Sequence, residues 1–246
     1  MPIETSQVSH QNPEAVRPED RALVKKFEKR KLFNPDGKTE VTMNKTSRTA
    51  LFIAIEEMSD LHEVTFRTFT DDDMIRYNLE SEKPTTYLHP VITKRDEHEI
   101  LFSRNMKDQL IIDSEKISIL LAKKMNLESK NITGDMRATF VILHEVGHHL
   151  ADGSKSREEL KDTKKAELER LKEIRSSYNP KDDPSGKEFY LLYHSLPSEA
   201  AADKFAASWM KKHMYLFDEK INHDLGKWSV IDDKPEQTTS GAQVYP

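Results

Sequence analysis

The segment VILHEVGHHLADG contains the motif H-E-x-x-H, formed by His144, Glu145 and His148. Histidines four residues apart in a helix differ by about 40° in direction, so both imidazoles can face one point and bind Zn²⁺ through neutral nitrogens. Glu145 lies about 100° round the helix from His144, where its carboxylate can reach a water on the metal without binding the metal itself. The spacing therefore predicts a zinc site with Glu145 as the general base of a hydrolytic reaction.

A catalytic zinc ion usually has three protein ligands and a water, so the two histidines leave one ligand to be found. Asp152 lies four residues after His148, but Gly153 predicts the end of the helix there and an aspartate that points to solvent. Glu199, 51 residues after His148 in the segment PSEAAAD, is the better candidate. Pro197 suits the first turn of a new helix, and the alanines allow that helix to pack closely on the histidine helix. We therefore expect Glu199 to be the third ligand.

Further polar residues near the two segments are candidates for supporting roles. Asp203 lies one helical turn after Glu199, where it can accept the free N–H of a ligand imidazole and fix the tautomer of that ring. His149 follows His148 but points in another direction, so we expect it to be exposed or in an outer shell. Four more donors flank the acidic segment and are expected to be structural: Tyr193, His194, His213 and Tyr215.

Beyond single residues, HEVGHHL followed by SEAAADKFAASWM resembles the gluzincin zinc metallopeptidases. The residues Phe205, Ala206 and Ala207 make it most similar to the ImmA/IrrE-type group, although the charged segment between the two helices is longer than that group leads us to expect. The resemblance implies a zincin-like fold, in which a small antiparallel or mixed sheet packs on the active-site helix and an edge strand binds extended peptide. The metzincin pattern is excluded, because it requires Gly and His where this chain has Ala151 and Ser154.

The chain around the motif predicts an α+β fold. Apolar residues at helical spacing predict helices that begin near Lys45 and Ser114, and further helices over residues 131–150 and within 189–217. Four short β-rich runs predict strands, at residues 63–69, 86–92, 99–102 and 110–113.

The strand pattern also predicts how the sheet is built. A polar turn predicts a hairpin between the runs at 86–92 and 99–102. Pro90 removes one ladder donor and indicates an edge or bulged strand. We expect a peptide to dock on the edge of the strand at 99–102 or at 110–113.

The 246 residues fit one domain with tails. Residues 1–44 are predicted to be a polar tail that can hold one helix, residues 45–231 to be the zincin-like domain, and residues 232–246 to be a disordered tail. A densely charged helix at residues 154–178 is inserted between the two ligand helices. Its apolar stripe is thin, which predicts a solvated helix held along one narrow face rather than a partner-binding coiled coil.

Composition limits the classes of function. The net charge of −5 gives no bulk attraction to nucleic acid, and the absence of cysteine excludes disulfides and cysteine metal sites. The apolar runs are much shorter than a membrane span, and the start MPIETSQVSHQNPEAVRPED lacks the pattern of a secretory signal. We therefore expect a soluble, cytoplasmic protein whose partner is a protein or peptide substrate.

Together these features predict a zinc metallopeptidase that hydrolyses peptide bonds with Glu145 as general base. Two alternatives stay open. The zinc can serve folding without turnover, or the protein can be a regulatory or interaction module in which the helix at 154–178 recruits a partner and the peptidase site is silent. Glu145 argues against the first, because a structural metal site has no use for a base there. The complete set of catalytic residues argues against the second.

Overall fold

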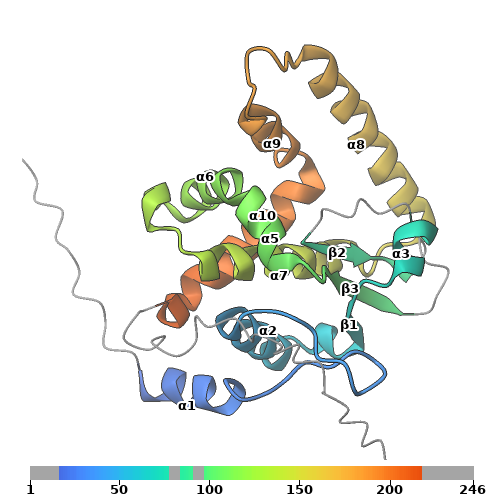
Figure 1. Cartoon of the computed structure of the whole chain (residues 1–246). Coiled ribbons are helices and arrows are strands. Elements are labelled where there is room, and N and C mark those ends of the chain that lie inside the picture. Colours follow the sequence, from blue (N-terminus) through green and yellow to red (C-terminus); the bar gives the residue numbers. More distant parts are fainter. Residues whose placement is uncertain (1–16, 78–83, 91–96, 218–246) are drawn as a thin grey trace, which may run out of the picture.

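The computed structural model describes residues 17–77, 84–90 and 97–217. These residues form an α+β fold, as predicted, in which helices surround a small three-stranded mixed sheet (Figure 1). No helix in the described ranges is long and apolar enough to cross a membrane. The elements are α1 (Pro18–Phe27), α2 (Lys45–Glu57), η1 (Ser59–Glu63), β1 (Val64–Thr68), α3 (Asp71–Arg76), β2 (Thr85–Leu88), β3 (His98–Phe102), α5 (Met106–Ile112), α6 (Ser114–Met125), η2 (Ser129–Asn131), α7 (Gly134–Asp152), α8 (Arg157–Ser177), α9 (Lys187–Tyr193), α10 (Pro197–Lys212) and η3 (Met214–Phe217).

Strand β3 lies in the centre of the sheet, with β1 parallel to it on one side and β2 antiparallel on the other. Thr85 pairs with Phe102 and Leu88 pairs with Glu99, so β2 and β3 are the two arms of the predicted hairpin. The turn between them lies outside the described residues. β2 is an edge strand that ends before Pro90. The expectation that the strand at 99–102 offers a docking edge is wrong, because β3 is paired on both sides.

The predicted strand at residues 110–113 is also wrong, since the segment belongs to helix α5 and the turn that follows it. Met106 and Leu110 are buried four residues apart, whereas Ile111 and Ile112 are 60% and 69% exposed. Burial at an interval of four is the period of a helix, while a strand would bury alternate residues. The edges of the described sheet are therefore β1 and β2.

Helix α7 is the central element, with α2, α10 and strand β2 packed around it (Figure 1). The Thr133 hydroxyl accepts a hydrogen bond from the Met136 N–H at 3.2 Å and caps the start of the helix. Phe140, Leu143 and Val146 are buried, as their helical spacing predicts. The H-E-x-x-H motif therefore sits on a helix that is fixed on several sides.

Gly147 allows α10 to lie directly against α7. A Cβ atom on Gly147 would be 2.7 Å from the Cα atom of Ala202. We expect Gly147→Ala to lower the free energy of unfolding by about 1–3 kcal/mol, because backbone atoms of α10 must move. Urea denaturation measures this, with Gly134→Ala as the control, because a Cβ atom there comes only to 3.8 Å of the Arg137 side chain. Equal unfolding free energies for the two variants would contradict this packing.

Residues 18–44 are part of the domain, which corrects the predicted polar tail. Phe27, Val41 and Met43 have no exposed surface, and α1 packs on α2. Few apolar residues lie in this stretch, but several of them enter the core, while the charged residues between them stay outside it. Three predicted segments lie outside the described residues: residues 1–16 of the tail, 218–231 of the domain and 232–246 of the C-terminal tail.

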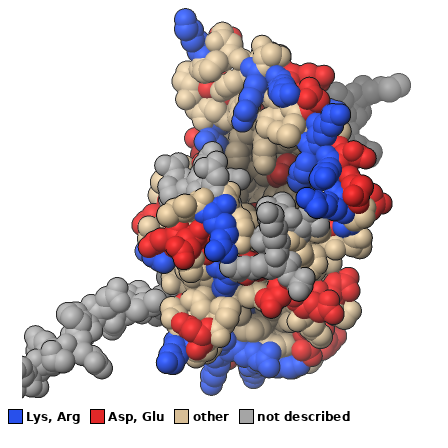
Figure 2. All heavy atoms as spheres, turned by 90° about the vertical axis from the view of Figure 1, so that its right-hand side faces the viewer, with Lys and Arg blue, Asp and Glu red and all other residues tan. Residues whose placement is uncertain are grey.

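The charged segment at 154–178 forms helix α8, which extends along one side of the molecule and away from the sheet (Figure 1). Leu160 and Ile174 are buried and Leu168 is 56% exposed, so the helix is held along one narrow face. The face of the molecule shown in Figure 2 carries interspersed basic and acidic side chains.

Candidate metal centre

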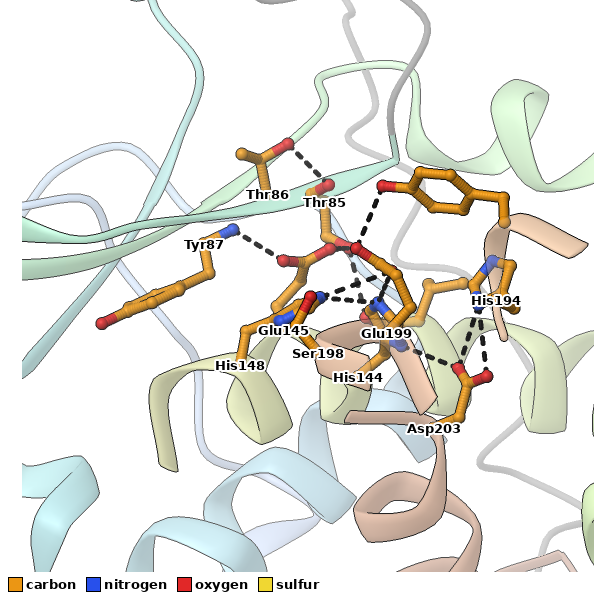
Figure 3. Close-up of polar contacts among 12 residues, drawn as sticks. Thr85, Thr86, Tyr87, His144, Glu145, His148, His194, Ser198, Glu199 and Asp203 are labelled. Carbon is orange, nitrogen blue, oxygen red and sulfur yellow. Dashed lines mark hydrogen bonds and ion pairs between the residues drawn. The ribbon is translucent and has the colours of Figure 1, made fainter. Parts of the chain in front are cut away.

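Helices α7 and α10 bring the three predicted metal ligands to one point (Figure 3). His144 and His148 lie one turn apart on α7, and Glu199 lies in the first turn of α10. The Nε2 atoms of the two histidines are 3.0 Å apart. The Glu199 Oε2 atom lies 3.2 Å from Nε2 of His144 and 3.5 Å from Nε2 of His148. The three donor atoms thus form a compact triangle.

This triangle has the size that a tetrahedral metal ion requires. Ligand atoms that are each roughly 2.0–2.1 Å from a zinc ion lie roughly 3.3 Å from one another. The observed separations of 3.0, 3.2 and 3.5 Å are close to that value. Imidazole and carboxylate groups are also ligands that zinc accepts. The cluster can therefore hold a metal ion, with a fourth position left for solvent or substrate.

Asp203 supports the cluster from behind, as predicted for an outer-shell residue. Its buried Oδ1 atom accepts a hydrogen bond from Nδ1 of His144 at 2.9 Å, and Lys124 lies 3.2 Å from its Oδ2 atom. Burial would raise the pKa of Asp203, but the hydrogen bonds from His144 and His194 hold it well below its usual range. The ionised carboxylate holds a proton on Nδ1 of His144, so Nε2, which faces the cluster, is the nitrogen that would bind a metal ion.

The acidic groups make the cluster attractive to a cation. Burial would raise the pKa of Glu199, but hydrogen bonds from His144 and His148 hold it far below its usual range. Burial lowers the pKa of His144, yet the hydrogen bonds to Asp203 and Glu199 outweigh burial and raise this pKa to about 10. Two ionised carboxylates therefore face one imidazole, and a bound metal ion would take the place of its extra proton.

Glu145 lies beside the cluster but is not part of it. Its Oε2 atom accepts a hydrogen bond from the Tyr87 N–H at 2.7 Å, and its Oε1 atom lies 3.5 Å from the Thr85 hydroxyl (Figure 3). Both contacts come from strand β2. Among the described residues, Glu145 belongs to neither group of side chains that can hold a metal ion. Its carboxylate is thus held by β2 in the same cavity as the ligands.

A cavity opens between the edge strand β2 and helices α7, α8 and α9. The ligands His144, His148 and Glu199 line it together with Glu145, while Phe140, Val141 and Tyr190 give it an apolar wall. The three donor groups and Glu145 therefore share one cavity.

Tyr193 and His194, which we expected to be structural, touch the site. The Tyr193 hydroxyl donates to Glu199 Oε1 at 3.0 Å, and His194 Nδ1 donates to Asp203 Oδ1 at 3.1 Å. Both residues lie just before Pro197, where the acidic helix begins, and this position in the sequence is the signal that could have placed them at the site. His144, His194 and Asp203 form a second, overlapping group that is close enough to hold a metal ion.

Among the described residues, the other candidates belong to neither group that can hold a metal ion. His149, which we expected to be exposed or in an outer shell, is buried, because its ring packs against the sheet. Asp152 is 3% exposed instead of pointing to solvent, and its carboxylate binds Lys155 at 2.7 Å. His213 follows the last residue of α10 and Tyr215 lies in η3, so both are at the far end of that helix.

A second group of imidazoles surrounds Tyr87, where strands β2 and β3 meet helix α7. The rings of His98 and His149 are 4.7 Å apart, and the Tyr87 hydroxyl lies 2.7 Å from Nδ1 of His98. Burial lowers the pKa of His98 from 6.5 to about 4, with smaller contributions from the nearby His149 and His89. His98 therefore stays neutral in the folded protein at pH values where the unfolded chain takes up a proton.

This difference predicts an acid-sensitive fold. The unfolded chain, with a His98 pKa of about 6.5, binds more protons than the folded protein between about pH 6.5 and about pH 4. The contribution of His98 to stability is therefore complete above about pH 6.5 and is lost as the pH falls toward 4. We therefore expect the free energy of unfolding to fall less for His98→Gln than for the wild type between about pH 7.5 and about pH 5, and denaturant unfolding at the two pH values measures this. An equal change in the two proteins would contradict this role of His98.

Comparisons of the chain with known protein families, with curated proteins and with solved structures find no match.

Proposed function

We propose that this protein is a zinc-dependent metallopeptidase that hydrolyses peptide bonds of a protein or peptide substrate. The observation that carries the proposal is the position of the Glu145 carboxylate, which is fixed beside the three-donor cluster and outside it. A metal site with an independent carboxylate next to its open position is the arrangement that hydrolytic zinc enzymes use. In this proposal the mixed sheet and helix α7 form a zincin-like core.

We assign the ion to His144, His148 and Glu199 rather than to the group that contains His194. In that second group, Asp203 accepts hydrogen bonds from Nδ1 of both histidines. A ring nitrogen that donates its proton has no lone pair for a metal. The Nε2 atoms of His144 and His148 instead meet at the cavity, next to Glu199.

The reaction we propose is attack of water on a peptide carbonyl. Bound zinc would lower the pKa of a coordinated water and polarise the carbonyl group. Glu145 takes a proton from the attacking water and passes it to the leaving amine. The Tyr87 N–H and the Thr85 hydroxyl keep its carboxylate aimed into the cavity during both transfers.

Two other residues keep the metal ligands in place. Asp203 holds the ring of His144 through Nδ1. Tyr193 binds Oε1 of Glu199, so Oε2 stays turned toward the imidazoles. Burial and the nearby Glu199 raise the pKa of Tyr193, so its hydroxyl remains a donor.

Strand β2 is the proposed docking edge for the substrate. It is paired only with β3 within the described sheet, and it borders the cavity that contains the ligands. An extended peptide can add to such an edge through main-chain hydrogen bonds. A peptide on β2 would pass Glu145, because Tyr87 of this strand binds that carboxylate.

The alternative is a catalytically silent zinc-binding module. Metal analysis of the purified protein and a peptide-library cleavage assay, with and without a chelator, separate the two. We expect one zinc ion per chain and cleavage that is lost with the metal and regained on addition of zinc. Stoichiometric zinc without cleavage would favour the silent module, and a metal-free protein that cleaves would contradict both.

A further inference from the structure

Helix α8 carries one buried acid that the proposed mechanism does not use. Glu167 is only 9% exposed, whereas the side chain of Glu169 on the same helix is 60% exposed. Removing a carboxylate from water costs free energy unless hydrogen bonds replace the lost hydration. The partners of Glu167 therefore show what its burial achieves.

The main partner of Glu167 is the first turn of the ligand helix α10. Its Oε1 atom accepts a hydrogen bond from the Ser198 N–H at 2.8 Å. Helix N-termini have free N–H groups that need acceptors. Leu196, the residue at the cap position, supplies no side-chain cap within the described chain, and Pro197 has no N–H to donate. Glu167 thus caps α10 from a different helix, with its negative charge at the positive end of the helix dipole.

The capped residue is the neighbour of a metal ligand. Ser198 immediately precedes Glu199, and both lie in the first turn of α10 (Figure 3). The Glu199 carboxylate is held at its outer oxygen by Tyr193. Glu167 holds the backbone from which the same side chain starts, so the two contacts together fix both ends of the ligand.

We propose that Glu167 is a positioning residue for the metal ligand Glu199, and that helix α8 is thereby a functional part of the metal centre. This inference rests on the proposed function, because it requires a metal ion at Glu199. Lys164, 3.4 Å from the Glu167 Oε2 atom, balances part of the buried charge and leaves Oε1 to Ser198.

Loss of the Glu167 carboxylate should weaken zinc binding when the metal-free protein is titrated with zinc. Glu167→Ala is expected to lower the zinc affinity about 10–100-fold, as for other residues that hold a metal ligand in place. Glu167→Gln keeps an oxygen that can accept a hydrogen bond from the Ser198 N–H, so its zinc affinity should stay within about threefold of that of the wild type. Glu169→Ala is the matched control, because that acid is exposed and pairs with Lys172 on the same helix.

The measurement is competition for zinc between each metal-free protein and a chromophoric chelator. The absorption spectrum of the cobalt-loaded proteins reports whether the coordination changes, and circular dichroism with thermal melting reports the fold. Glu167→Met is a second variant, since it fills a similar volume without an acceptor.

The inference is supported if the folded Ala or Met variant binds zinc more weakly and Gln restores the affinity. It is wrong if a folded Ala or Met variant binds zinc as tightly as Glu169→Ala, or if both variants unfold, because Glu167 would then hold the fold and not the ligand. A wild-type protein that binds no zinc would be a different result, which removes the proposed function and this role with it.

Discussion

Glu145→Gln is expected to abolish most peptide cleavage while zinc stays bound. A general base contributes about 10²–10⁴-fold to a rate, so kcat should fall by about that factor. Glutamine has the shape of glutamate and keeps an oxygen that can accept the Tyr87 N–H, which now binds Glu145 at 2.7 Å. The cavity should therefore keep its form and lose only the group that takes the proton. Steady-state kinetics on a cleaved library peptide, with metal analysis of the same sample, measure both effects.

The control for this prediction is Glu158→Gln, which changes an exposed acid in the first turn of α8. It removes the same charge without touching the site and should leave kcat and zinc content unchanged. A Glu145→Gln protein that keeps zinc and full activity would show that another group takes the proton. A Glu145→Gln protein that loses zinc would show that Glu145 is a ligand.

Glu199→Ala is expected to cause the largest loss of metal affinity. The substitution removes the carboxylate that lies 3.2 Å and 3.5 Å from the two imidazole nitrogens. Loss of an outer-shell partner costs roughly 10–100-fold in affinity, and loss of a ligand should exceed that range. In zinc competition titrations, Glu199→Ala should therefore have a lower zinc affinity than Asp203→Asn, and Asp203→Asn a lower zinc affinity than the wild type.

The same titrations distinguish the two groups that can hold a metal ion. If zinc binds to His144, His148 and Glu199, then His148→Ala should lose most of its affinity and His194→Ala should lose less. The opposite order would move the site to His194 and Asp203. Unchanged zinc binding in Glu199→Ala would contradict our assignment of the third ligand.

Much of the site could be predicted because its geometry is local. His144 and His148 are four residues apart in one helix, and this interval alone directs both rings to one side. Glu199 was harder, because its approach depends on a contact between distant segments. The sequence held a clue in the small residues, and Gly147 and Ala202 do allow the close contact of α7 and α10.

Other features had no local signal. The run at 110–113 is short and apolar, and such runs do not distinguish a strand from a helix until tertiary contacts decide. His149 is buried because strand β3 places His98 against it, which its neighbours in the sequence do not indicate. Glu167 likewise looks like any other acid of a charged helix, since its partner Ser198 lies 31 residues away.

The most direct test of the account is a crystal structure of the zinc-loaded protein with anomalous diffraction data at the zinc edge. We predict one strong anomalous peak between His144, His148 and Glu199, with the two Nε2 atoms and a Glu199 oxygen at bonding distances of roughly 2.0–2.2 Å. The Glu145 carboxylate should lie beside the peak without a bond to it. Absence of a peak there, or a Glu199 side chain turned away from both imidazoles, would contradict the metal centre on which the proposed peptidase depends.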